Sequence, residues 1–371
     1  IAAFSSTQLA ALTRTQITAL SATDVAELTT TELASMSSTM LSSLSSTALQ
    51  GLSTTLIASL STTQIKGLTS TQCASLTETQ LAAFADTQIA ALNITTIRGL
   101  ASTAISALTE TQIHALSPQQ LSAISAAATS MLTTTQLAGL DATQLAGLTP
   151  TQMSWLKSTA IAALSSTQIQ ALSSRQIGSI TPTALSGLST SQVALLSATQ
   201  IQGLTTTQVA SLSSTAVTSI TATQLGSMSL AQLRAISSTN ISALTSTQMQ
   251  QLSTTRIASL TATQIAGFTA TDMAELSLTN LAALTKTELS ALSASALQGL
   301  TETQIAALTT AQISGLSSTQ VSALSSDQIA ALSTTQLKAL SNSGIGGLNL
   351  TGIGAMTTTQ LAAMTSSQIA A

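Results

Sequence analysis

The side chains most able to do chemistry are few and isolated. His114 is the only histidine and Cys73 the only cysteine among 371 residues. Catalysis needs a nucleophile beside a base or a pair of carboxylates, and a metal site needs several ligands together. One histidine and one cysteine predict no His-based relay, no His-rich metal site and no intrachain disulfide. We therefore expect no enzyme activity and no catalytic, cofactor-binding or metal-binding residue.

Composition argues against several further functions. Charged residues make up 6% of the chain and its net charge is −3, so we expect no nucleic-acid partner, because such binding depends on many basic contacts. No phosphate-binding glycine loop, CxxC pair or EF-hand pattern is present. Three segments match the N-glycosylation sequon, a frequent coincidence in a Thr-rich chain. They are Asn93-Ile94-Thr95, Asn240-Ile241-Ser242 and Asn349-Leu350-Thr351.

The sequence that carries these residues repeats every eight positions. Counted from Ile1, 46 octads follow without insertion or deletion, and residues 369–371 open another copy. A fixed short period predicts a repeat architecture. Position four is apolar in every octad, and position one is Ile, Leu, Val or Met except at Cys73 and Thr129. Positions one and four are therefore the predicted core, where Cys73 acts as an inert small hydrophobe.

The polar positions predict helix starts. Position five is Ser or Thr in all but six octads, and position eight is mostly Gln. Ser/Thr-x-x-Gln is the capping box. Pro118, Pro150 and Pro182 all lie at position six, where a helix tolerates proline as its first residue. Each octad thus predicts a helix of about six or seven residues that ends at the small residue of position three, with positions two (including His114), six and seven facing water.

Such short helices are not stable alone, so they must stack on one another. We expect an all-α solenoid with one short capped helix per octad, continuous as a single domain over residues 1–371. A β-solenoid is the alternative, because Thr is plentiful. Positions one and four have opposite parity, however, and Val and aromatic residues are scarce, which disfavours strands.

Alanine at position eight suggests the superhelical period. Seven octads carry it, with gaps of 7, 3, 4, 3, 4 and 10 octads. A spacing near 3.5 octads fits most gaps, which predicts about three to four helices per superhelical turn. The seven positions are Ala48, Ala104, Ala128, Ala160, Ala184, Ala216 and Ala296.

Two regions depart from the pattern. Thr129 occupies a core position, Met131 and Trp155 occupy small-residue positions, and Lys157 replaces a cap. We expect local repacking in which Met131 and Trp155 fill space around Thr129; the alternative is a small binding patch for a ring or a sugar. Residues 341–356 hold five glycines in irregular repeats, so we expect a soft spot or bend there, without a domain boundary.

Apolar runs stop at each cap, so no stretch approaches the roughly 18 to 20 residues of a membrane span. No signal peptide is recognisable, and the first residue is Ile. The first residue opens an octad and the last falls inside one, so we expect an excerpt of a longer array.

Runs such as residues 308–337, LTTAQISGLSSTQVSALSSDQIAALSTTQL, resemble LTTTQIAAL-type octapeptide arrays. These occur in very large secreted or surface proteins of bacteria, often called adhesin-like. The resemblance covers the whole chain. It implies an extracellular or cell-surface location, while the calcium-binding or adhesive modules that such proteins often carry are not in this sequence.

The octad accounts for nearly every residue through folding alone. We therefore expect a structural, non-enzymatic rod, either the subunit of a filament or the stalk of a bacterial surface protein, with other copies of itself as partners. A Ser/Thr-rich surface that binds ice, carbohydrate or another surface ligand is the alternative.

Overall fold

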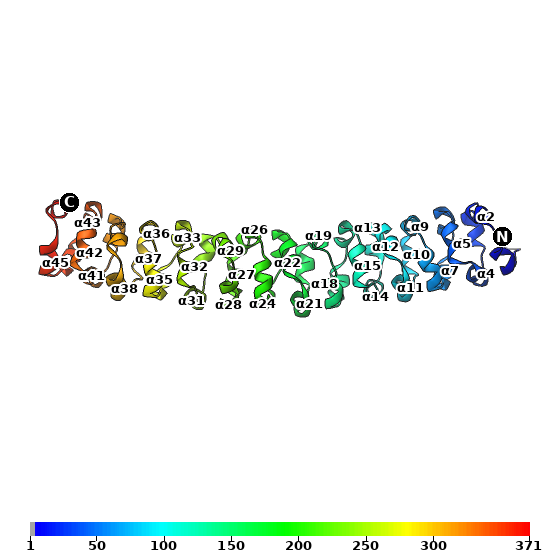
Figure 1. Cartoon of the computed structure of the whole chain (residues 1–371), viewed down its shortest axis with the longest axis horizontal. Coiled ribbons are helices and arrows are strands. Elements are labelled where there is room, and N and C mark those ends of the chain that lie inside the picture. Colours follow the sequence, from blue (N-terminus) through cyan, green and yellow to red (C-terminus); the bar gives the residue numbers. More distant parts are fainter. Residues whose placement is uncertain (1–3) are drawn as a thin grey trace. The chain divides into compact units, whose positions relative to one another are not determined.

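A computed structural model describes residues 4–371, and all regular structure in them is α-helical, without a strand. The β-solenoid alternative is therefore wrong, and the all-α prediction is confirmed. The chain divides into two compact units, Ile1–Leu188 and Ser189–Ala371. Each unit is a succession of short helices (Figure 1). That the two form one continuous solenoid stays a prediction.

The helices of the first unit are α1 Ser6–Ala10, α2 Arg14–Thr18, α3 Ala22–Ala26, α4 Thr30–Ser35, α5 Ser38–Ser43, α6 Ser46–Gln50, α7 Thr54–Ser59, α8 Thr62–Gly67, α9 Ser70–Ser75, α10 Glu78–Ala82, α11 Asp86–Ala91, α12 Ile94–Gly99, α13 Ser102–Ala107, α14 Glu110–His114, α15 Pro118–Ala123, α16 Ala126–Thr129, α17 Thr134–Ala138, α18 Ala142–Ala146, α19 Pro150–Met153, α20 Ser158–Ala162, α21 Ser166–Ala171, α22 Ser174–Ser179 and α23 Pro182–Leu185.

The helices of the second unit are α24 Thr190–Leu195, α25 Ala198–Gly203, α26 Thr206–Ala210, α27 Ser214–Ser219, α28 Ala222–Ser227, α29 Leu230–Ala235, α30 Ser238–Ile241, α31 Ser246–Gln250, α32 Thr254–Ile257, α33 Ala262–Ile265, α34 Ala270–Glu275, α35 Leu278–Ala282, α36 Lys286–Ala291, α37 Ala294–Leu297, α38 Glu302–Ala307, α39 Thr310–Ile313, α40 Ser318–Ser322, α41 Ser326–Ala330, α42 Thr334–Ala339, α43 Asn342–Ile345, α44 Leu350–Ala355, α45 Thr358–Ala363 and α46 Ser366–Ile369.

Each helix starts at the predicted cap. In α8 the Gln64 N–H donates to Ser61 Oγ at 3.3 Å, and the Ser61 N–H donates to Gln64 Oε1 at 2.9 Å. The three prolines occupy the first turn of α15, α19 and α23, as predicted. Position four ends the helix by turning extended, as Leu68 does with φ −63° and ψ 137°. The helices are four to six residues long, slightly shorter than predicted.

Positions one and four form the core. Ile65 at position one of its octad is 0% exposed, and Leu68 at position four is 2% exposed. The glycine-rich residues 341–356 stay helical in α43 and α44, where Ser341 and Asn349 accept the N–H groups of Gly344 and Gly352. The caps therefore persist through this segment, while its softness stays a prediction.

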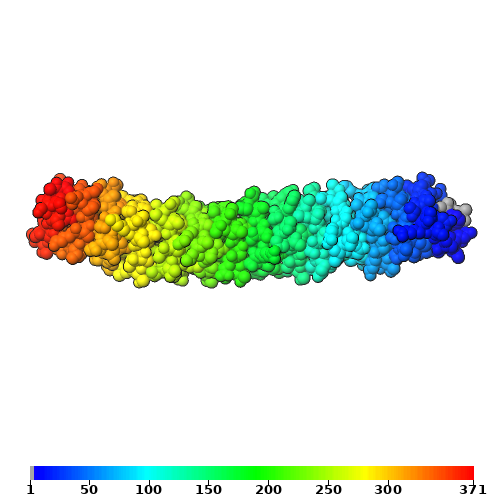
Figure 2. Space-filling view, turned by 45° about the horizontal axis from the view of Figure 1, so that its top comes forward, coloured from blue at the N-terminus to red at the C-terminus, as the bar shows by residue number. Residues whose placement is uncertain are grey.

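Within each unit, most helices pack against the helix three places along the chain. In Figure 1, α9 and α12 lie side by side in this way. Within each unit, the colours of the space-filling view follow one another in sequence order (Figure 2). Each segment therefore contacts mainly the turns before and after it, as expected of a solenoid.

Candidate functional site

The most extensive polar feature is a ladder of glutamine side chains at position eight. Gln168 accepts the Ser165 N–H on Oε1 at 2.8 Å, which closes its own cap. Its Nε2 then donates to the carbonyls of Leu137 at 3.0 Å and Leu140 at 2.7 Å. These carbonyls lie 31 and 28 residues earlier, at the end of α17. One carboxamide thus starts one helix and covers the end of another in the previous turn.

The ladder sets the superhelical turn. The second unit repeats it: Gln232 Nε2 donates to Ile201 O at 2.8 Å and to Leu204 O at 2.7 Å, again 31 and 28 residues earlier. An offset of 28 residues is 3.5 octads, which confirms the predicted three to four helices per turn. The half-integral number places each helix across the junction between two helices of the previous turn.

Sequence reasoning missed that position eight is buried. Gln168 is 2% exposed and Gln232 is 4% exposed, although only positions one and four were predicted as core. A signal was present, because a capping box accepts Glu as readily as Gln. Gln nevertheless fills 27 of the 46 octads and Glu only two. The preference indicates a need for N–H donors, which a carboxylate lacks.

Several substitutes at position eight keep the donor to the carbonyl 28 residues earlier. Thr96 Oγ1 donates to Leu68 O at 2.8 Å, and Asn240 Nδ2 donates to Leu212 O at 2.7 Å. Arg256 donates through Nη2 to the carbonyls of Gly226 and Met228. Burial lowers the pKa of Arg256. The common requirement is a donor that satisfies the carbonyl, since an unpaired buried carbonyl is costly.

Acidic residues that replace Gln at position eight have carboxyl pKa values that shift in opposite directions in buried and open octads. Asp272 is 4% exposed, and its burial raises the pKa of the carboxyl despite hydrogen bonds from Thr269. At the more open Asp24, the Ser21 backbone N–H and then the Ser21 hydroxyl lower the carboxyl pKa. The cap alone therefore favours a carboxylate, and coverage by neighbouring turns opposes it.

The structure keeps His114 and Cys73 apart from other chemistry. Cys73 is buried in the core as predicted, and its burial raises the pKa of the thiol to about 12. His114 is half-buried, so the prediction that it faces water is wrong. Its ring lies against Gly139, 25 residues later, where the absence of a side chain leaves room for it. Within residues 4–371, no group of three or more His, Cys, Asp or Glu side chains could hold a metal ion.

The irregular region around Trp155 is open, which overturns part of the predicted repacking. Trp155 is 52% exposed and Met131 is 45% exposed, so neither fills space around Thr129. Thr129 is instead stabilised by hydrogen bonds: its Oγ1 donates to Ser125 O at 3.0 Å and accepts from Gln152 Nε2 at 3.2 Å.

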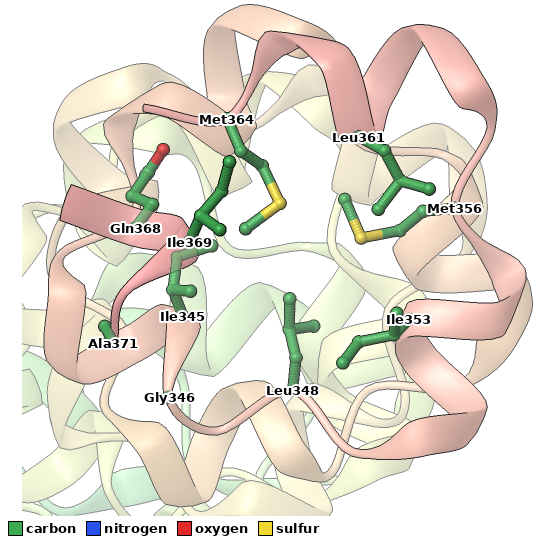
Figure 3. A pocket seen from close by; sticks show the side chains of 10 residues that line it. All are labelled: Ile345, Gly346, Leu348, Ile353, Met356, Leu361, Met364, Gln368, Ile369 and Ala371. Carbon is green, nitrogen blue, oxygen red and sulfur yellow. The ribbon is translucent and has the colours of Figure 1, made fainter. Parts of the chain in front are cut away.

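A second candidate site is an apolar pocket of about 440 Å³ near the end of the second unit. Figure 3 shows the residues that line it, which come from α43 to α46, the segments between them and Ala371 after α46. Most occupy positions one and four, the core positions of the octad. Ile353 is 44% exposed, Leu361 40% and Ile369 70%, whereas equivalent core residues such as Ile305 and Ile313 are 0% exposed. The lining residues are Ile345, Gly346, Leu348, Ile353, Met356, Leu361, Met364, Gln368, Ile369 and Ala371.

Comparison with known proteins agrees with the repeat architecture. Residues 306–334 match the family model of the ALTTAQ repeat. That stretch contains the hexapeptide ALTTAQ itself, at residues 307–312. No curated protein matches the chain. In the part of the chain that is described, no helix is long and apolar enough to cross a membrane. The array is therefore similar to ALTTAQ repeats.

Proposed function

We propose that this chain is a structural protein, a rigid extracellular rod of stacked octads that serves as a filament subunit or as the stalk of a surface protein. The glutamine ladder supports the proposal. It uses the most abundant polar side chain of the buried positions to join each turn to the next, so those groups are committed to neighbouring backbone. Few polar groups remain for chemistry.

The partner that fits best is a second copy of the chain, joined end to end. The apolar pocket of α43 to α46 exposes core positions of the same kind that most octads bury. Gln8 and Gln16 are exposed, and each closes its own cap through Oε1. Among the described residues, neither has a partner for Nε2. A following copy could therefore donate from these amides to carbonyls such as those of Met356 and Met364, and continue the ladder.

Electron microscopy of the purified chain tests the filament. We expect long uniform fibres that shorten on dilution. Leu361→Glu, which places a charge in the pocket, should abolish them. Leu350→Glu is the matched control, because Leu350 is 90% exposed and lies outside the pocket lining. Discrete short particles at every concentration would refute the role of filament subunit, and the stalk would be the remaining proposed role.

The alternative of hydroxyl rows that bind ice or carbohydrate gains no support from the caps. The position-five hydroxyls accept backbone N–H groups in nearly all the described helices, as Ser165 Oγ accepts the Gln168 N–H at 3.2 Å. We therefore do not propose those hydroxyls as a binding surface.

A further inference from the structure

Ala160 leaves a vacancy in the glutamine ladder. It occupies position eight, where most octads place a carboxamide, and beside it lies a pocket of about 230 Å³. One wall is residues 129–134, and the other is Leu156, Lys157, Thr159 and Ala160, one turn later. We propose that this pocket binds the acetamido group of an N-acetylated sugar. The proposal is independent of the structural role.

The polar groups of the pocket match a carboxamide. By the offsets of the ladder, the carbonyl of Leu132 lies 28 residues before Ala160, and the N–H of Lys157 lies three before it. In the octad of Gln168, the equivalent groups bind the side-chain amide, as Ser165 N–H to Oε1 at 2.8 Å and Nε2 to Leu140 O at 2.7 Å. Within residues 4–371, the Leu132 carbonyl and the Lys157 N–H have no hydrogen-bond partner.

A ligand amide can therefore repeat what Gln does elsewhere. Its carbonyl oxygen accepts the Lys157 N–H, and its N–H donates to the Leu132 carbonyl. A secondary amide has one N–H, which is enough for the carbonyl 28 residues earlier, the nearer of the two in the octads of Gln168 and Gln232. Charged groups fit less well, because a carboxylate has no donor for the carbonyl and an ammonium has no acceptor for the N–H.

The exposed side chains near the pocket favour a ligand whose amide is attached to a sugar ring. Trp155 directly precedes the lining residues Leu156 and Lys157, and it is 52% exposed. Met131, which lines the opposite wall, is 45% exposed. An exposed aromatic side chain offers an apolar face and a polar edge, which suits a sugar ring with C–H faces and hydroxyl edges. Ala104 is another alanine at position eight, and neither its octad nor residues 73–78, the equivalent wall one turn earlier, contain an aromatic residue, so it provides a control.

Ligand titration with N-acetylglucosamine tests the site, with glucose as the sugar that lacks the amide. Trp155 is the only tryptophan and directly precedes the lining residue Leu156, so its fluorescence is the optical readout of this region. We expect saturable binding of N-acetylglucosamine and at least tenfold weaker binding of glucose. Ligand-observed saturation-transfer NMR should place the strongest transfer on the acetamido methyl group, and it detects binding even if the fluorescence does not change.

The deciding variant is Ala160→Gln, which fills the vacancy with the residue that most octads carry. We expect it to fold, with a raised midpoint of thermal unfolding, and to lose binding of N-acetylglucosamine at least tenfold. Ala104→Gln should gain stability in the same way and keep binding. Equal affinity for both sugars, no saturable binding, or unchanged binding in Ala160→Gln would each overturn the proposal.

Discussion

At the scale of the residue, the carboxamide of Gln is the group that distinguishes this fold from a plain set of capped helices. Its oxygen accepts a hydrogen bond in the local cap, and its nitrogen donates to carbonyls 28 to 31 residues earlier, as in Gln168. The sequence reveals the first role because the cap lies three residues away. It hides the second, because nothing in one octad indicates which carbonyls the next turn will bring close.

Substitution of Gln168 should separate these two roles. Gln168→Ala leaves the Leu137 and Leu140 carbonyls unpaired, and we expect a loss of about 1 to 3 kcal/mol in the free energy of unfolding. Gln168→Glu retains the capping acceptor but buries a charge against carbonyls, so it should cost more than Ala. Chemical denaturation measures both. Gln8→Ala is the control, since Gln8 is exposed; if Glu were tolerated as well as Gln at residue 168, the ladder would not contribute to stability.

Asp272 is a residue at which the ladder can be repaired. Burial raises its pKa, so the native state binds a proton more tightly than the unfolded chain, and this contribution to stability is lost as the pH rises through the native pKa. Asp272→Gln should therefore gain about 1 to 3 kcal/mol at pH 7 through the new donor and the removed charge, and less at low pH. Thermal unfolding across pH measures this difference. Glu302→Gln, on the exposed face, should change stability by less than about 0.5 kcal/mol.

At the scale of the element, helices of four to six residues are held by their caps and by close approach to the previous turn. The period, the caps, the proline sites and the core positions one and four were readable from the sequence, because each depends on residues within one octad. The placement of His114 was not, because it depends on Gly139 one turn away. The exposure of Trp155 likewise depends on the packing of neighbouring turns.

Two glycines of the second unit test how close the turns lie. A Cβ at Gly299 would overlap the Ala270 carbonyl of the previous turn, whereas a Cβ at Gly226 would meet nothing within 4 Å. Gly299→Ala should lower the free energy of unfolding by about 1 to 3 kcal/mol through overpacking. Gly226→Ala, inside α28, should raise it by up to about 1 kcal/mol through helix propensity. Equal effects in denaturant titrations would show that the turns adjust freely.

At the scale of the whole molecule, the ladder glutamines within each unit keep the same offsets of 28 and 31 residues, so the number of octads should matter less than their phase. Deletion of residues 305–312, one complete octad, preserves the 28-residue offset for all later ladder positions. Deletion of residues 305–308 removes half an octad. The Gln residues of the next turn then lie 28 residues after a position-eight carbonyl instead of a position-four carbonyl, so the ladder contacts across the deletion are lost. Circular dichroism should show native helicity per residue and a cooperative transition only for the first deletion. Equal loss of helicity in both would contradict the phase rule.

The half-integral turn has a mechanical consequence. Because each helix lies across a junction of the previous turn, the extended residues between helices do not line up into a seam along either unit. A protease that cuts the chain at the Leu140–Asp141 junction leaves both new ends tied to another turn. The Leu140 carbonyl still accepts from Gln168, and the Asp141 end is held by Gln144 of its own octad, which donates to Leu116 O. We therefore expect a nicked unit to stay assembled and to separate only in denaturant, because the hydrogen bonds between turns hold the two pieces together.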